Sequence, residues 1–223
     1  MLILGIEAAT KVASAAVVSD EKILAEISQE ARLTHSETLL PQIEQVLKIA
    51  GVEKVDAVAV SIGPGSFTGL RIGLATAKSL AYAWQIKIIG VPTLQAISYH
   101  FPTASATILP LLDAQKNRAY VQSFRKCQPL SKIEVKPIDE TVTAAGEIGG
   151  EVFLCGDVLN KIKVELPLNV RIAPVNCRMP RAANVALCGK FLLDAGETSN
   201  IMNLEPLYVR RSEAEELWER RQK

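Results

Sequence analysis

A glycine-rich turn is the first stretch of the sequence whose residue types and spacing could do chemistry. The residues GPGSFTG at 63–69 join an almost entirely apolar stretch, 55–62, to an amphipathic one. Glycines permit positive φ or close backbone approach, and Ser66 or Thr68 could cap a helix whose free N–H groups would face an anion. The turn lacks the lysine and the spacing of the known phosphate-binding glycine motifs. Two interpretations stay open, an anion site and a tight strand-to-helix corner.

Histidines and cysteines limit the chemistry further. His35 and His100 are the only histidines, no H-E-x-x-H occurs, and the glycine turn does not have the G-x-S-x-G spacing of a hydrolase. The cysteines are widely spaced with no C-x-x-C pair, which favours reduced core thiols over disulfides or a zinc site: Cys127, Cys155, Cys177 and Cys188. We therefore predict no catalytic residue and no metal site.

Charge and hydropathy exclude two classes of protein. The formal net charge is +1, so the chain has no global attraction to nucleic acid or to an anionic membrane. No apolar run reaches the roughly 18 residues that span a bilayer, and the first residues do not have the pattern of a secretory leader. We expect a cytoplasmic protein without a membrane association.

The elements that would position these residues alternate between strands and helices. Apolar periodicity in the first half predicts strands at 2–8, 13–19, 23–29, 55–62 and 86–91, helices at 35–50 and 66–84, and a short helix that Thr93 caps and that ends at Phe101. Thr34 and Glu37 form a capping box. Pro41 lies deep enough in its helix to predict a kink or a broken first turn.

The same order of elements recurs after the segment FPTASAT at 101–107. Strands are predicted at 108–114, 118–124, 132–138, 152–156 and 170–174, with helices from 139 onward and at 180–195. This order predicts an α/β duplication with domains at 1–103 and 104–223. Near the end, Ser212 and Glu215 form the capping box of a charged helix, which is either a solvated surface or a contact for a partner or RNA.

The two longest predicted helices, 35–50 and 66–84, are apolar over broad arcs. Small residues in the second helix, such as Gly69 and Gly73, would let another helix approach closely. The apolar arcs belong either to the core or to half of an intermolecular four-helix bundle. For the second interpretation, the predicted partner-binding residues are Leu39, Leu40, Ile43, Leu47, Leu70, Leu74, Ala77 and Ala81.

Five motifs together resemble the TsaB (YeaZ) family. They are ILGIEAATKVASAAVV, HSETLLPQI, GPGSFTGLRIGLATAKSLA, LLDAQKNRAYV and EPLYVRRSEAEELW. The resemblance covers almost the whole chain, and its GPGSFTGLRIG block is highly specific. Proteins of this family belong to the bacterial machinery that makes N6-threonylcarbamoyladenosine at position 37 of tRNAs decoding ANN codons.

The resemblance implies a duplicated actin-like fold of the ASKHA, ribonuclease-H-like type, with two α/β domains and mixed sheets. It implies a scaffold that activates TsaD, the catalytic paralogue that transfers a threonylcarbamoyl group from threonylcarbamoyl-adenylate to N6 of adenine 37. The implied partners are a TsaD-type subunit, bound through the helices around 35–50 and 66–84, and a TsaE-type ATPase. The isolated chain would form a homodimer, and tRNA would be met only through the complex.

Departures from the relatives' patterns point to a missing active site. His35 has Leu39 four residues later, where a TsaD-like metal clamp has a second histidine, and Glu7 stands where actin-like ATPases carry an aspartate. The segment D-A-R-x-x-E-V-Y reads DAQKNRAY at 113–120. What remains is a vestigial nucleotide loop of Glu7, Thr10, Gly63, Gly65 and Ser66. We expect no cofactor to be held tightly by this chain alone, with ATP or ADP left open at an interface of the complex.

Two other functions stay in view. A stand-alone actin-like nucleotide-binding ATPase would show turnover by the chain alone, and this turnover would respond to a change at Glu7. A peptidase would need a nucleophile–base pair or a histidine pair, and the sequence offers neither. The scaffold interpretation is the leading one.

Overall fold

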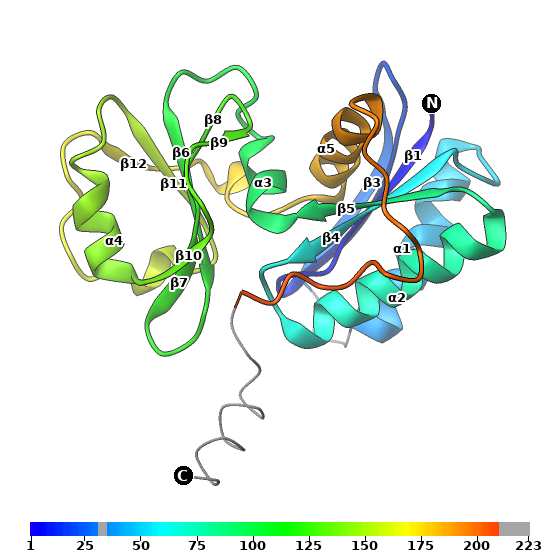
Figure 1. The fold of residues 1–223 in the computed structure, drawn as a ribbon, viewed down its shortest axis with the longest axis horizontal. Coiled ribbons are helices and arrows are strands. Elements are labelled where there is room, and N and C mark those ends of the chain that lie inside the picture. The colour runs from blue at the N-terminus through cyan, green and yellow to red at the C-terminus, as the bar shows by residue number, and fades with distance from the viewer. Residues whose placement is uncertain (31–34, 210–223) are drawn as a thin grey trace, which may run out of the picture.

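The computed structural model of the protein describes residues 1–30 and 35–209, which form two α/β halves side by side (Figure 1). The first half contains a five-stranded mixed sheet of order β3-β2-β1-β4-β5. The pairs β1–β2 and β2–β3 are antiparallel, and the pairs β1–β4 and β4–β5 are parallel. The strands are β1 (Ile3–Glu7), β2 (Val12–Val18), β3 (Ile23–Glu30), β4 (Ala57–Gly63) and β5 (Lys87–Pro92).

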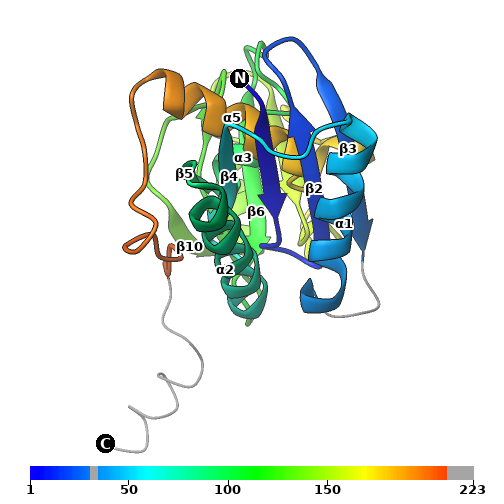
Figure 2. The same ribbon diagram turned by 90° about the vertical axis from the view of Figure 1, so that its right-hand side faces the viewer.

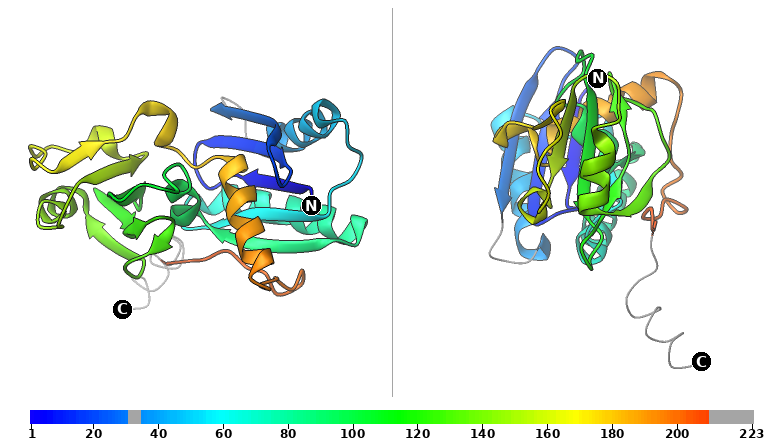
Figure 3. Two further views of the ribbon diagram at one scale, coloured as in Figure 1. Left: turned by 90° about the horizontal axis from the view of Figure 1, so that it is seen from above. Right: turned by 90° about the vertical axis from the view of Figure 1, so that its left-hand side faces the viewer.

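Helices cover both faces of this sheet, which explains why its central strands are apolar at nearly every position. One face carries α1 (His35–Ala50) and α2 (Phe67–Trp84), as Figure 2 shows. The other face carries α5 (Ala182–Asp194) (Figure 3). Successive residues of β1 accordingly enter two different cores, with Leu4 facing α1 and α2 and Ile3 facing α5.

The second half repeats the strand order of the first in a seven-stranded sheet, in which β8 pairs with β6 and with β9. Its sheet has the order β10-β7-β6-β11-β12, again with two antiparallel pairs followed by two parallel ones. Its elements are β6 (Thr107–Asp113), β7 (Arg118–Val121), β8 (Phe124–Arg125), β9 (Gln128–Pro129), β10 (Glu134–Pro137), α4 (Ile138–Ala145), β11 (Val152–Gly156) and β12 (Val170–Ile172). The expected duplicated α/β fold with two mixed sheets is confirmed.

The chain crosses between the halves twice. α3 (Thr93–Ser98) leads out of the first half and contacts both β6 and α5. After β12, the chain returns, and α5 packs on β1, β2, β4 and β5. Although the sequence placed the helix at 180–195 in a domain of residues 104–223, its contacts are therefore with the first sheet. His100 ties the two crossings together, since its Nε2 lies 2.8 Å from the carbonyl oxygen of Met179.

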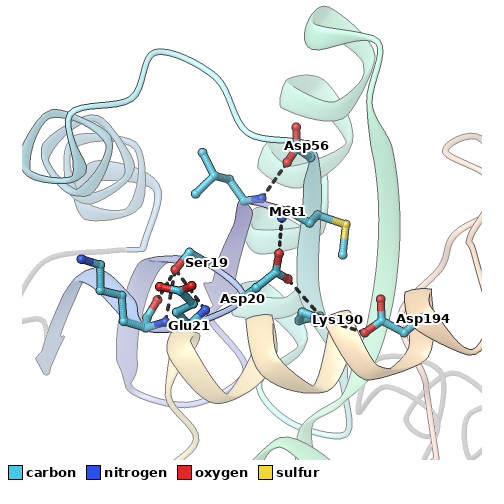
Figure 4. Close-up of polar contacts among 9 residues, drawn as sticks. Met1, Ser19, Asp20, Glu21, Asp56, Lys190 and Asp194 are labelled. Atoms are coloured by element: carbon cyan, nitrogen blue, oxygen red, sulfur yellow. Dashed lines mark hydrogen bonds and ion pairs between the residues drawn. The ribbon is translucent and has the colours of Figure 1, made fainter.

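Ion pairs connect the C-terminal part of α5 to the β2–β3 turn of the first sheet (Figure 4). Lys190 on α5 lies 3.3 Å from an oxygen of Asp20 in the β2–β3 turn and 2.6 Å from Asp194. The same Asp20 accepts from the amino group of Met1 at 2.5 Å, which holds the pKa of this carboxyl below its usual range. These exposed ion pairs add little stability individually.

The structure differs from the sequence-based expectation at three places in the helices of the first half. α1 continues as a helix through Pro41 from His35 to Ala50, so the predicted broken first turn is wrong. Thr93 does not cap its helix, because its hydroxyl accepts from the N–H of Gly63 at 3.1 Å. α3 ends at Ser98 instead of Phe101. The expected capping box at Thr34 and the charged helix at 210–223 lie outside the described residues.

A C-terminal strap, residues 197–209, follows α5 and runs back along the first half (orange to red in Figure 1). It begins on the edge of the sheet, where Ser199 donates its N–H to the carbonyl of Ile88 at 3.0 Å. In the part of the chain that the structure describes, no helix is both long and apolar enough to cross a membrane.

Candidate partner-binding face and glycine corner

The glycine turn connects β4 to α2 over the β1–β2 turn, residues 8–11. Gly63 has φ of +113°, which favours glycine, and a Cβ there would lie 3.1 Å from both Leu70 Cδ1 and the carbonyl oxygen of Leu207. At Gly65 and Gly69, a Cβ would collide with the carbonyl oxygens of Ala9 and Ala8, respectively. These glycines are therefore required by the close approach of α2 to the β1–β2 turn.

The hydrogen bonds at this corner are internal to the chain. Ser66 is the N-cap of α2, and its Oγ accepts from the N–H of Gly69 at 3.3 Å. The N–H of Ser66 itself donates to the carbonyl of Ala9 at 2.7 Å. Two carbonyl oxygens, of Ala8 and Ala9, face the start of the helix and would repel an anion. The structure thus favours the corner over the phosphate cradle.

The β1–β2 turn also uses its N–H groups for hydrogen bonds within the chain, which leaves fewer donors for a phosphate. Side chains of this chain bind two of its N–H groups and the N–H of the first residue of β2: Ala8 N to Ser61 Oγ at 3.5 Å, Ala9 N to Glu7 Oε1 at 2.5 Å and Val12 N to Thr10 Oγ1 at 3.2 Å. Actin-like nucleotide sites need such backbone donors to be free. The N–H groups of Ala8 and Ala9 are therefore already engaged and are not free to bind a phosphate group at this turn.

Glu7 is the most unusual side chain of the first half. It ends β1, is fully buried and pairs across the sheet with the buried Ser14. Its Oε2 has no hydrogen-bond partner among the described residues. Burial raises the pKa of its carboxyl to about 7, against the opposing hydrogen bonds from Ala9 and Ser61. A group of this kind exchanges its proton near neutral pH.

The proposed loop residues are only partly brought together. Glu7 and Ser66 both contact Ala9, so they flank the same turn. Thr10 is buried in this turn, and its carbonyl oxygen lies 2.7 Å from Nε2 of His35 on α1. Gly63 instead faces the C-terminal strap at Leu207.

Metal chemistry has no visible basis within residues 1–30 and 35–209, where no three His, Cys, Asp or Glu side chains gather closely enough to hold an ion. His35 is engaged with the backbone of Thr10, and the residue one turn further, Leu39, is buried in the core.

The second half has a carboxylate at the corresponding strand end, with different neighbours. Asp113 ends β6, accepts from the N–H of Gln115 at 3.0 Å and lies 2.7 Å from Nζ of Lys161. Asp157 accepts from the N–H of Asp113 at 2.9 Å, and burial raises the pKa of the Asp157 carboxyl. The turn residues Gln115, Lys116 and Asn117 all have positive φ.

The set of partner-binding residues needs a correction. Six of the eight are buried within this chain, so they cannot touch a partner directly: Leu39, Ile43, Leu70, Leu74, Ala77 and Ala81. Leu47 is half-buried against the same core, and Leu40 alone is exposed. The apolar arcs of α1 and α2 were assigned correctly as continuous faces, but these faces bury the first sheet.

The exposed side of α2 carries a cluster that sequence reasoning missed. The ring of Phe67 lies 5.2 Å from that of Tyr208 on the strap, and the Arg71 guanidinium lies 3.9 Å above Phe67. Arg71 Nε also donates to the hydroxyl of Tyr208 at 3.1 Å. The i, i+4 spacing of Phe67 and Arg71 could have revealed half of this cluster, whereas nothing in the spacing indicates Tyr208.

Two sheets of matching strand order, each with a carboxylate where its first strand ends, define a duplicated actin-like α/β protein. A solved structure described as YeaZ from Pseudomonas aeruginosa superposes with a TM-score of 0.77 at 21% identity, covering 93% of this chain and 99% of that one. The ROK hexokinase from Thermus thermophilus gives a TM-score of 0.51 at 13% identity, covering 86% of this chain and 100% of that one. These likenesses show the fold.

The family follows from the sequence comparisons. A model described as "TsaD: tRNA N6-adenosine threonylcarbamoyltransferase" matches residues 22–218, so the chain belongs to this family. Two proteins named TsaB, for tRNA threonylcarbamoyladenosine biosynthesis, are similar over nearly their full length. That of Bacillus subtilis is 28% identical over 100% of both chains, and that of Escherichia coli 27% identical over 96% of both. The resemblance to TsaB (YeaZ) proteins is confirmed.

A transferase of the family is also similar over part of the chain. The tRNA N6-adenosine threonylcarbamoyltransferase of Symbiobacterium thermophilum is 37% identical over 116 residues, which cover 44% of this chain and 34% of that protein. The chain is therefore related to both kinds of protein, and its full-length likeness is to TsaB.

Proposed function

We propose that this chain is the scaffold subunit that activates a TsaD-type transferase in the synthesis of N6-threonylcarbamoyladenosine on tRNA. The observation that carries the proposal is the full-length match to proteins named for this biosynthesis. The duplicated fold agrees with this proposal, because a paralogue of the transferase can pair with the transferase through similar surfaces.

The chain itself is non-catalytic in this proposal. Its support is the inward-directed hydrogen bonding of the β1–β2 turn, whose donors are bound by Glu7, Thr10 and Ser61. The engagement of His35 with a backbone carbonyl adds to it. In this proposal, the chain alone holds no nucleotide tightly, and any ATP or ADP is bound where subunits meet. A TsaE-type ATPase joins the complex, which contacts tRNA through its other subunits.

Reconstitution tests the proposal. The TsaD-type transferase of the same organism is incubated with threonylcarbamoyl-adenylate and unmodified tRNA, with and without this chain, and modified adenosine is measured by mass spectrometry. We expect modification to require both proteins. Full modification without this chain would overturn the scaffold function. ATP turnover by the chain alone, altered by Glu7→Gln, would instead support the stand-alone ATPase.

A further inference from the structure

α5 begins directly over the end of β1. A Cβ on Gly5 would collide with the carbonyl oxygen of Ala182, the first residue of α5, so the helix rests on the backbone of the strand. Because side chains alternate along a strand, Glu7 lies on the same face of the sheet as Gly5. α5 runs from there toward the β2–β3 turn, where Lys190 pairs with Asp20. The carboxyl of Glu7 therefore lies on the face that α5 covers, next to the start of this helix.

Side chains from neighbouring strands cap α5. The N-cap residue, Arg181, makes no capping hydrogen bond with its own side chain. Instead, the Oγ of Ser14 on β2 accepts from the N–H of Ala182 at 3.0 Å, and the Oε1 of Glu26 on β3 accepts from the N–H of Ala183 at 3.1 Å. These acceptors satisfy N–H groups of the first turn, which have no partner within the helix. The first turn of α5 thus depends on polar side chains of the sheet.

Ser14 links this cap to Glu7. The two residues are partners in the antiparallel ladder between β1 and β2, so their side chains are neighbours on one face of the sheet. Both are completely buried, as is Ser61, whose hydroxyl group forms a hydrogen bond with the carboxyl of Glu7. The first turn of α5 is therefore part of the cover that separates this carboxyl from water.

No cation balances a charge on Glu7 within residues 1–30 and 35–209. The ionisable side chains of the elements around it are exposed or engaged elsewhere: Lys11 in solvent, Arg71 with Tyr208, His35 with the carbonyl of Thr10, His100 with the carbonyl of Met179, Arg178 with the carbonyl of Ala173, and Arg181 with Glu26. The Oε2 of Glu7 has no hydrogen-bond partner there either. The protonated carboxyl is the form that this environment stabilises, and an ionised one needs water.

We propose that the protonation state of Glu7 controls whether the first turn of α5 stays packed on β1 and β2. While the carboxyl is protonated, the turn remains in place. When the carboxyl is ionised, the turn moves away far enough for water to reach it. The chain returns from the second half at this turn, close to the contact between His100 and Met179, so the change also loosens the connection between the halves. The inference goes beyond the proposed function and requires no partner protein.

Amide hydrogen exchange of the full chain, followed by mass spectrometry from pH 4.5 to 8, tests the inference. Glu7→Gln keeps the size of the side chain and cannot ionise. A peptide from residues 180–188 has the same intrinsic exchange rate in both proteins at a given pH, so the ratio of the two measured rates reports opening alone. Peptides from the central strand β4 distinguish opening of this turn from unfolding of the whole first half.

The expected pH dependence follows from the two pKa values. Burial raises the pKa of Glu7 from 4.5 to about 7, so a state that exposes the carboxyl to water becomes more populated as pH rises through this interval. Residues 180–188 should exchange at equal rates in both proteins at pH 4.5. The wild type should then become faster than Glu7→Gln, by up to about tenfold for each pH unit up to pH 7, and the ratio should stay constant above it.

Two results of this experiment would overturn the inference. One is a ratio that stays the same from pH 4.5 to 7. The other is an equal acceleration in β4 and in residues 180–188, because the opening would then be global unfolding.

The reciprocal effect gives a second test, which needs no change at Glu7. Ser14→Ala removes the acceptor for the N–H of Ala182 and loosens the first turn of α5. If ionisation of Glu7 releases this turn, then releasing the turn must favour ionisation. In a carbon-13 NMR titration of the Glu7 carboxyl, Ser14→Ala should lower the pKa from its value of about 7. Ser131→Ala, at an exposed serine of the second half, is the matched control and should leave it unchanged. An unchanged pKa in Ser14→Ala would contradict the inference.

Discussion

Glu7 and Asp113 end the first strands of the two halves, β1 and β6, and each accepts a hydrogen bond from the N–H two residues further on. Their surroundings differ. The Asp113 side chain is 27% exposed and paired with Lys161, whereas Glu7 is fully buried and forms no ion pair with any cation of residues 1–30 and 35–209. The two strand ends thus share the same backbone hydrogen bond to their carboxyl group. They differ in whether an ion pair accompanies it.

Burial is the cause of the difference. The turn that follows β6 protrudes with three residues of positive φ, so solvent and Lys161 reach Asp113. The turn that follows β1 is instead covered by α2, whose glycines allow the helix to approach the backbone of Ala8 and Ala9. A carboxylate closed off in this way keeps its proton to a higher pH than an exposed one.

Replacing Glu7 has the largest expected effect on this comparison. Because the pKa in the folded state is about 7 and the ordinary value is 4.5, the folded state binds more protons, and stability falls as pH rises from 4.5 to 7. At pH 8 the buried charge costs about 3 kcal/mol. We expect Glu7→Gln to raise the free energy of unfolding at pH 8 and to change it little at pH 4.5.

Urea denaturation of both proteins between pH 4.5 and 8.5 measures this difference. Glu134→Gln, an exposed site on β10, serves as the control and should follow the wild-type pH dependence. Parallel pH profiles for the wild type and Glu7→Gln would show that Glu7 is not the titrating group.

Filling the glycine corner should have the next largest effect. Gly69→Ala places a methyl group against the carbonyl oxygen of Ala8, and we expect a loss of about 2 kcal/mol in the free energy of unfolding. Gly149→Ala in the second half is a suitable control, because nothing lies within 4 Å of the added carbon. Equal denaturation midpoints for the two variants would contradict the close approach of α2 to the β1–β2 turn.

Removing the cation of the second half should have the smallest effect. Lys161→Met breaks the partly exposed pair with Asp113, and we expect a loss of about 0.5 kcal/mol. The loss should largely disappear in 1 M salt, where exposed charges are screened. Thermal unfolding at low and high salt measures this loss. A loss of several kcal/mol would contradict the comparison, because it would mean that the Asp113 carboxylate is shielded from solvent as the Glu7 carboxylate is.

The alternation of strands and helices could be predicted from the sequence, because the sheets bury apolar residues with clear periods. Periodicity does not say which chain covers an apolar face, so Leu39 and Leu74 were placed in an interface although they lie in the core. Thr93 was expected to cap its helix because only its own segment was considered, whereas its hydroxyl bonds Gly63 from another element. The strap could not be predicted from the sequence, because its residues follow no apolar period and its backbone carbonyls accept hydrogen bonds from Lys78, which is distant in the sequence.

The return of α5 to the first sheet has a consequence for how the protein is made. On the ribosome, residues 1–103 emerge before any of the second half, yet one face of their sheet is covered largely by residues 182–194. Until then, Ile3, Ala57 and Val91 lack the residues of α5 that complete their core. The core of the first half therefore cannot be completed until residues 182–194 have been synthesised.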